Sequence, residues 1–129
     1  MTRSAHFGFL IVSVLVFSTT GCAGHSKSSY ADQPESVVMD HKDEFNRCYE
    51  LAVQQRAPDE PKPVGRLEIL YTISPSGMVT DVHVLTSASH NMKLEDCVLG
   101  TFKRLKFSSN PDGQLIQGSH AFDFKDQKG

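Results

Sequence analysis

The sequence lacks tryptophan, has only three cysteines in 129 residues and shows no large excess of either charge. Its 13 Lys and Arg are interleaved with 15 Asp and Glu, so no basic stripe marks a nucleic-acid-binding protein. The absence of tryptophan, with few aromatic residues outside the expected core, argues against a surface on which sugars stack. The composition therefore predicts one small domain that has no nucleic acid as partner.

The spacing of the polar residues indicates neither a catalytic site nor a metal site. The histidines are scattered, and no pair has the close spacing of a zinc motif. Asp81 and His83 lie near each other on one expected strand, but no serine nucleophile matches them. We therefore expect no enzymatic activity, no metal and no cofactor.

No apolar run is long enough to cross a membrane. The run at residues 7–17 is shorter than the roughly 20 residues that a membrane-spanning helix needs. Arg3 precedes this run and the small residues 18–21 follow it. A charged start, a short apolar core and a small-residue exit are typical of a secretory signal peptide, which we place at residues 1–21.

The small residues that end in Gly21 and Cys22 resemble the cleavage box of bacterial lipoproteins. The resemblance implies cleavage before Cys22 and a diacylglycerol on its sulfur, although Thr19 stands where a leucine is usual. Ala23, in place of an aspartate, implies the outer membrane as destination. A single acyl chain binds a membrane only reversibly, so several chains on Cys22 would hold the protein there. The alternative is a secreted protein that is cut near Thr20 and keeps Cys22 as a free thiol.

The chain after Cys22 is small and polar, and residues 22–34 are expected to form the lipidated cysteine and a flexible tether. A helix follows, with Asp32 and Glu35 as a capping-box pair. Prolines in the segment 57–63 end it. Its apolar face recurs at spacings of three and four: Val37, Val38, His41, Phe45, Cys48, Tyr49 and Ala52.

Two strands and a second helix are expected next. Residues 67–73 alternate as a half-buried strand, residues 74–77 form a turn, and residues 78–86 form a second strand with a bulge near Val79. The second helix carries an apolar stripe of its own: Leu94, Cys97, Val98, Thr101, Phe102 and Leu105. A third strand runs over about residues 114–124, and a right-handed crossover places it antiparallel beside the first strand.

The predicted fold class is therefore α+β. The order is helix, strand, strand, helix, strand, and both helices cover one face of a three-stranded sheet.

This order and its residues resemble the C-terminal domain of the TonB family, and more closely its AgmX/PglI C-terminal domain subgroup. The stretches that carry the resemblance are FNRCYELA, GRLEILYTISPSGMVTDVHVLTSAS, LEDCVLGTFKRLKF and HAFDF. The resemblance implies a domain at residues 35–125 and a frayed tail at 126–129. Ser108 and the segment 120–122 depart from the family pattern. Since neither an inner-membrane helix nor a long Pro-rich spacer is evident, we do not expect energy transduction.

Cys48 and Cys97 form a pair once Cys22 is set aside as the lipid attachment point. Each lies on the apolar stripe of its helix, and both helices are expected on the same face of the sheet. Because an exported protein lies in an oxidising compartment, we expect a disulfide between them. The alternatives are two buried thiols, or a thiol oxidoreductase, which the apolar setting disfavours.

The third strand is the expected functional site, because it lies at the edge of the proposed sheet. An edge strand presents unpaired backbone groups that an extended partner can complete, and the resembled family binds partner peptides on this strand. The residues expected to take part are Leu115, Gln117, Gly118, Ser119 and Ala121.

The expected protein is a non-catalytic lipoprotein on the periplasmic face of the outer membrane that binds an unknown envelope protein. The alternative is a structural component of a gliding-motility or envelope complex, with a homodimer as one form.

Overall fold

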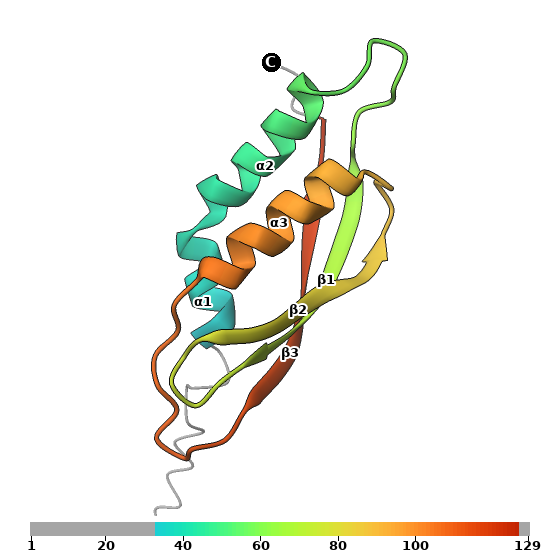
Figure 1. The fold of residues 1–129 in the computed structure, drawn as a ribbon. Coiled ribbons are helices and arrows are strands. Elements are labelled where there is room, and N and C mark those ends of the chain that lie inside the picture. Colours follow the sequence, from blue (N-terminus) through green and yellow to red (C-terminus); the bar gives the residue numbers. More distant parts are fainter. Residues whose placement is uncertain (1–32, 127–129) are drawn as a thin grey trace, which may run out of the picture.

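The computed structural model describes residues 33–126, which fold into three helices and one three-stranded sheet. Figure 1 shows that the helices cover one face of the sheet, so the predicted α+β class and layer arrangement are confirmed. The elements in chain order are α1 (Gln33–Asp40), α2 (Lys42–Gln54), β1 (Gly65–Ile73), β2 (Val79–Ser87), α3 (Met92–Arg104) and β3 (Ile116–Phe124).

The first predicted helix is two helices, because the chain turns at His41. The backbone N–H of His41 donates to the carbonyls of both Val37 and Val38, at 3.3 and 3.2 Å. The apolar face continues across the turn, since Val38 and Phe45 are both buried. Gln33 and Pro34 lie in the first turn of α1, where the capping-box prediction places a helix start. A proline is tolerated in the first turn of a helix because that turn has no partner for its N–H.

The central strand of the sheet is β1, which pairs antiparallel with β2 on one side and β3 on the other. Its alternate residues Leu67, Ile69 and Ile73 have no exposed surface, as the period of two predicts. The pairing with β3 runs from Gly65↔Phe124 to Ile73↔Ile116 without a register shift. The predicted position of the third strand is therefore confirmed.

The pairing of β1 with β2 is interrupted at both ends. The register shifts between Thr72 and Ile73, where Thr80 is the extra residue, and this is the bulge predicted near Val79. A second shift between Glu68 and Ile69, with Leu85 as the extra residue, was not predicted. A bulge twists a strand and breaks its ladder, so the two outer strands of this sheet differ in regularity.

The turn between β1 and β2 needs a glycine at position 77. Gly77 has a φ of 86°, and its carbonyl accepts a hydrogen bond of 2.9 Å from the N–H of Phe107. A Cβ atom on Gly77 would lie 2.0 Å from the carbonyl oxygen of Phe107. The turn and the segment after α3 are thus packed backbone against backbone, which only glycine permits.

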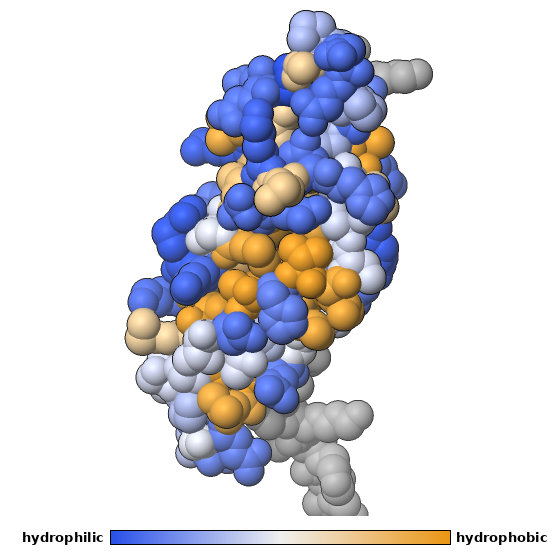
Figure 2. Space-filling view, turned by 45° about the vertical axis from the view of Figure 1, so that its right-hand side comes forward, coloured by the Kyte–Doolittle hydropathy of each residue, from blue (hydrophilic) through white to orange (hydrophobic). Residues whose placement is uncertain are grey.

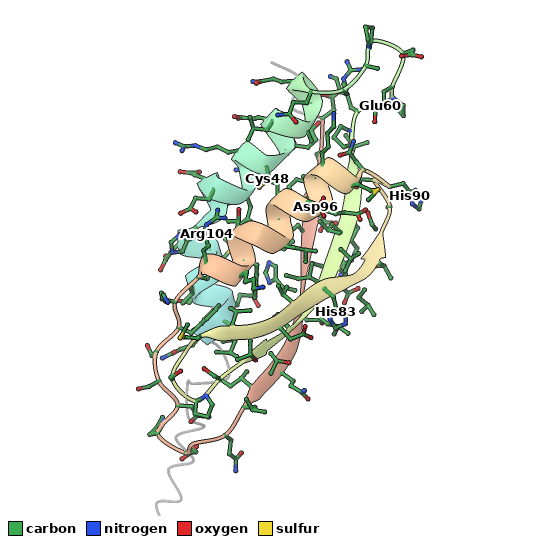
Figure 3. The ribbon with its side chains drawn as sticks, viewed as in Figure 1. Cys48, Glu60, His83, His90, Asp96 and Arg104 are labelled. Atoms are coloured by element: carbon green, nitrogen blue, oxygen red, sulfur yellow. A yellow bond between two sulfur atoms is a disulfide. The ribbon has the colours of Figure 1, made fainter. Side chains whose placement is uncertain are left out.

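A disulfide joins the two main helices of the covering layer. Figure 3 shows Cys48 on the side of α2 that faces α3, and Cys48 is bonded to Cys97 with their Cα atoms 5.5 Å apart. The Oγ1 atom of Thr101 lies 3.6 Å from the Sγ atom of Cys48 in the buried interface. The disulfide expected from the sequence is therefore present in this structure.

The double variant Cys48→Ala/Cys97→Ala is expected to lower the free energy of unfolding by about 4 kcal/mol, the chain-entropy value for a loop of this length. Urea unfolding followed by circular dichroism measures the change. Cys22→Ala is the control and should unfold at the wild-type midpoint. Equal midpoints for the double variant and the wild type under non-reducing conditions would contradict a stabilising role for the bridge.

Candidate functional site

The strand β3 forms one edge of the sheet, since within residues 33–126 only β1 pairs with it. Gln117 and Ser119 are exposed, and Ala121 is half-buried. Leu115 was expected in the strand but precedes it, and 59% of its surface is exposed. The reason is the length of β1, which ends at Ile73 opposite Ile116 and leaves no partner for Leu115. The strand β3 therefore begins at Ile116, two residues after its predicted start at about residue 114.

Gly118 is packed against a side chain of the neighbouring strand β1. It lies directly opposite Tyr71 in the register, and a Cβ atom on Gly118 would be 2.6 Å from the hydroxyl oxygen of Tyr71. The glycine is required because the phenol ring of the central strand covers it. Burial raises the pKa of the Tyr71 hydroxyl, and the negative charge of Glu35 raises it further.

A groove runs between the helices α1 and α2 and the second half of β3, beside the free edge. Two adjoining hollows form it, and they share Lys42, Asn46, Asp123 and Phe124. Its floor is apolar, with the rings of Phe45 and Phe122 at 4.6 Å between centroids. We call it the edge groove and define it by Val38, Met39, Lys42, Phe45, Asn46, Tyr49, His120, Ala121, Phe122, Asp123, Phe124 and Lys125.

The helix side of the edge groove was not predicted from the sequence. Met39, Lys42 and Asn46 recur at spacings of three and four, next to the buried stripe that contains Val38 and Phe45. This second stripe is a sequence pattern from which the helix side of the groove could have been predicted. The residues of β3 that complete the groove follow more than 70 positions later, so only the packed chain brings them together.

His120 is half-buried in the edge groove, with its ring at 4.7 Å from that of Phe122. Burial lowers the pKa of the His120 imidazole, and the carboxylate of Glu35 partly opposes this shift. Protonation of an imidazole that is packed against apolar side chains costs desolvation energy, so the folded state favours the neutral form.

The remaining polar candidates lie outside the edge groove. Asp81 and His83 approach to 3.2 Å on β2, and both are exposed. Figure 3 places His83 on the strand, away from the helices. Among residues 33–126, no group of three or more His, Cys, Asp or Glu side chains is arranged to hold a metal ion. This pair is a contact between two exposed side chains on β2.

A hydrophobic area occupies the middle of the face shown in Figure 2. This view brings forward the side on which β2 lies in Figure 1. Val82 and Val84 of β2 and Leu99 of α3 are partly buried against the core, and Leu85 is exposed. The molecule thus has apolar surface beside β2 as well as beside β3.

Three solved C-terminal domains are similar to this chain. The Pseudomonas aeruginosa TonB domain is 27% identical, covers 51% of this chain and 69% of its own, and has a TM-score of 0.39. The HasB domain is 18% identical, covers 86% of each chain and has a TM-score of 0.45. The Helicobacter pylori TonB domain is 17% identical, covers 78% of this chain and 95% of its own, and has a TM-score of 0.35.

The chain thus resembles a TonB C-terminal domain. No family model matches it, and no curated protein does. The AgmX/PglI subgroup therefore stays a prediction.

The expected membrane attachment lies outside the described residues, because Cys22 and the signal peptide precede Gln33. Within residues 33–126, every helix is too short or too polar to span a bilayer. At the other end, Asp126, predicted to begin a frayed tail, is held by Lys62 through a contact of 2.6 Å.

The stability of the domain is expected to fall as the pH is lowered from 7 to 5. The folded pKa of His120 lies below its unfolded value of about 6.5, so the unfolded chain takes up the proton first and is favoured in acid. His120→Gln should reduce this dependence, measured as urea midpoints at several pH values. His83→Gln changes an exposed imidazole outside the edge groove and is the comparison variant. Equal slopes for His120→Gln and the wild type would contradict the assignment.

Proposed function

We propose that this domain is a non-catalytic protein-binding module that takes an extended segment of an envelope protein beside β3. One observation carries the proposal. β3 pairs with β1 in unbroken register, and its other side pairs with no residue in the range 33–126, whereas the opposite edge strand β2 has two bulges. Bulges hinder pairing, and a regular edge invites it, so β3 is the edge suited to a fourth strand.

A fourth strand beside β3 would lie about 4.8 Å from it and complete alternate N–H and C=O groups of its backbone. Gln117 and Ser119, both exposed, would flank it on the face away from the helices. The edge groove would flank it on the helix side. The backbone groups of β3 would thus provide affinity for the added strand. The different side chains on its two faces would select the sequence of the partner segment.

We further propose that the domain is held on the periplasmic face of the outer membrane. The signal peptide at residues 1–21, acylation of Cys22 and a tether to Asp32 would place it there. The support is the short apolar run and the Gly21-Cys22 junction in the sequence. The disulfide between Cys48 and Cys97 agrees with an exported protein, since disulfides persist in oxidising compartments.

A thiol oxidoreductase is not proposed. Cys48 is 2% exposed in the interface between α2 and α3. A redox-active cysteine needs access to its substrate and surroundings that favour the thiolate. The buried sulfur of Cys48 has no such access in this packing, and Cys97 is half-buried beside it.

The second candidate is a structural role in a gliding-motility or envelope complex through self-association. The hydrophobic area of Figure 2 favours it, because Leu85 is exposed next to the partly buried Val82 and Val84. In this case a second copy would bind beside β2, and the β3 edge would play no part.

Ser119→Pro is expected to reduce partner recovery at least tenfold in a crosslinking pull-down from intact envelopes, since proline removes an N–H and fits an added strand poorly. Ser119→Lys is a second variant that opposes edge pairing while keeping the N–H. Thr86→Lys on β2 is the matched control. Circular dichroism checks the fold. An unchanged recovery profile for both folded Ser119 variants would contradict strand addition, and its loss in Thr86→Lys alone would favour the β2 side.

Acylation of Cys22 is expected to be visible by metabolic labelling with an alkyne fatty acid. The wild-type chain should carry the label and sediment with membranes, whereas Cys22→Ala should do neither. Cys48→Ala/Cys97→Ala controls for labelling of other thiols and should remain acylated. A wild-type chain without label, released with the periplasmic fraction, would contradict the lipid anchor.

A further inference from the structure

We propose that the edge groove selects the partner segment by taking one large apolar side chain next to an Asp or Glu carboxylate. The inference rests on the proposed strand addition at β3 and specifies its ligand. The hollow part of the groove has a volume of about 200 Å³, against about 30 Å³ for a water molecule, so it has room for a side chain.

The position of the groove fixes which partner residues would enter it. Side chains of a strand point alternately to the two faces of the sheet. On β3, Phe122 and Phe124 point to the helix layer and are buried there, and His120 lines the groove. Alternate residues of an added strand would point the same way and would meet the wall formed by α1 and α2.

The apolar part of the proposed ligand follows from the surface around this position. Phe45 and Phe122 form the floor, and Met39 on the rim is 56% exposed. An exposed methionine beside two aromatic rings is an adaptable contact for an apolar side chain. An entering side chain would remove the exposed surface of Met39 from water, which favours binding.

The acidic part of the proposed ligand follows from the charges on the rim. Lys42 and Lys125 border the groove, and neither forms an ion pair with any residue in the range 33–126. The carboxylate of Asp123 is paired with Arg66 at 3.7 Å. Asn46 adds an amide donor to the same hollow. Lys42, Lys125 and Asn46 therefore favour a negative charge at this end of the groove, whereas the carboxylate of Glu35 acts on His120 at the other.

A second copy of this chain does not fit the groove through its own β3. Its helix-side residues Phe122 and Phe124 are buried under its own helices, so none of them is available as the entering side chain. The ligand is therefore a segment that is extended and not already part of a packed sheet.

Selection of random twelve-residue peptides on phage tests the charge preference, with the purified protein as target. Peptides selected on the wild type should be enriched in Asp or Glu at least threefold over the library. Lys42→Glu/Lys125→Glu should abolish this enrichment or reverse it toward Lys and Arg. It should also weaken a wild-type-selected peptide roughly tenfold, as two exposed charge pairs allow. Lys103→Glu/Lys106→Glu is the matched control and should select like the wild type, since it changes two exposed lysines, one in the last turn of α3 and one just after it.

The apolar preference is tested in the same selection with Met39→Ser. This variant should reduce the enrichment of large apolar residues and weaken a selected peptide by about threefold to fivefold, since it removes part of one apolar contact. Met92→Ser changes a methionine that is 75% exposed on α3, away from the groove, and is the control.

The outcomes separate this inference from the proposed function. Peptides that Ser119→Pro abolishes, but that show no acidic or apolar preference, would overturn the groove inference and leave strand addition standing. Enriched peptides that bind Ser119→Pro and Ser119→Lys as well as the wild type would overturn the groove inference, because they bind elsewhere. A selection that enriches no peptide would count against both.

Discussion

The burial of one face of β1 under two crosslinked helices is the constraint on which the rest of the structure depends. Leu67, Ile69 and Ile73 lie fully inside, and the disulfide between α2 and α3 fixes the helices above them. Because β1 pairs on both sides, β2 and β3 can only be edges. The position of α2 relative to β3, and hence the edge groove, follows from this arrangement.

The function proposed for this domain depends on its surfaces and not on reactive side chains. The buried polar contacts that the structure describes, such as Thr101 beside Cys48, serve packing. The groups that face outward at β3 are backbone atoms on one side and a mixed apolar and cationic wall on the other. This combination is suited to recognising an extended chain, in which main-chain pairing gives affinity and pockets give specificity.

The helices and strands could be predicted from the sequence better than the contacts between them. The alternation of residues 67–73 and the helical spacing of Cys48 and Cys97 are local patterns, and they correctly indicated the sheet and the disulfide. The turn at His41 and the bulge at Leu85 depend on how neighbouring helices and strands pack together, and no local sequence pattern predicted them. The contact of Tyr71 with Gly118, and the edge groove itself, join residues far apart in the chain, so only the packed fold reveals them.

The two bulges of β2 have a consequence for stoichiometry. A sheet with two regular edges can grow in both directions, and its copies can then stack into open-ended fibres. In this domain the register of β2 is broken at Thr80 and Leu85, so β3 is the only regular edge among the described residues. A copy of the domain therefore offers one regular edge for an added strand, and its sheet is not suited to grow from both sides.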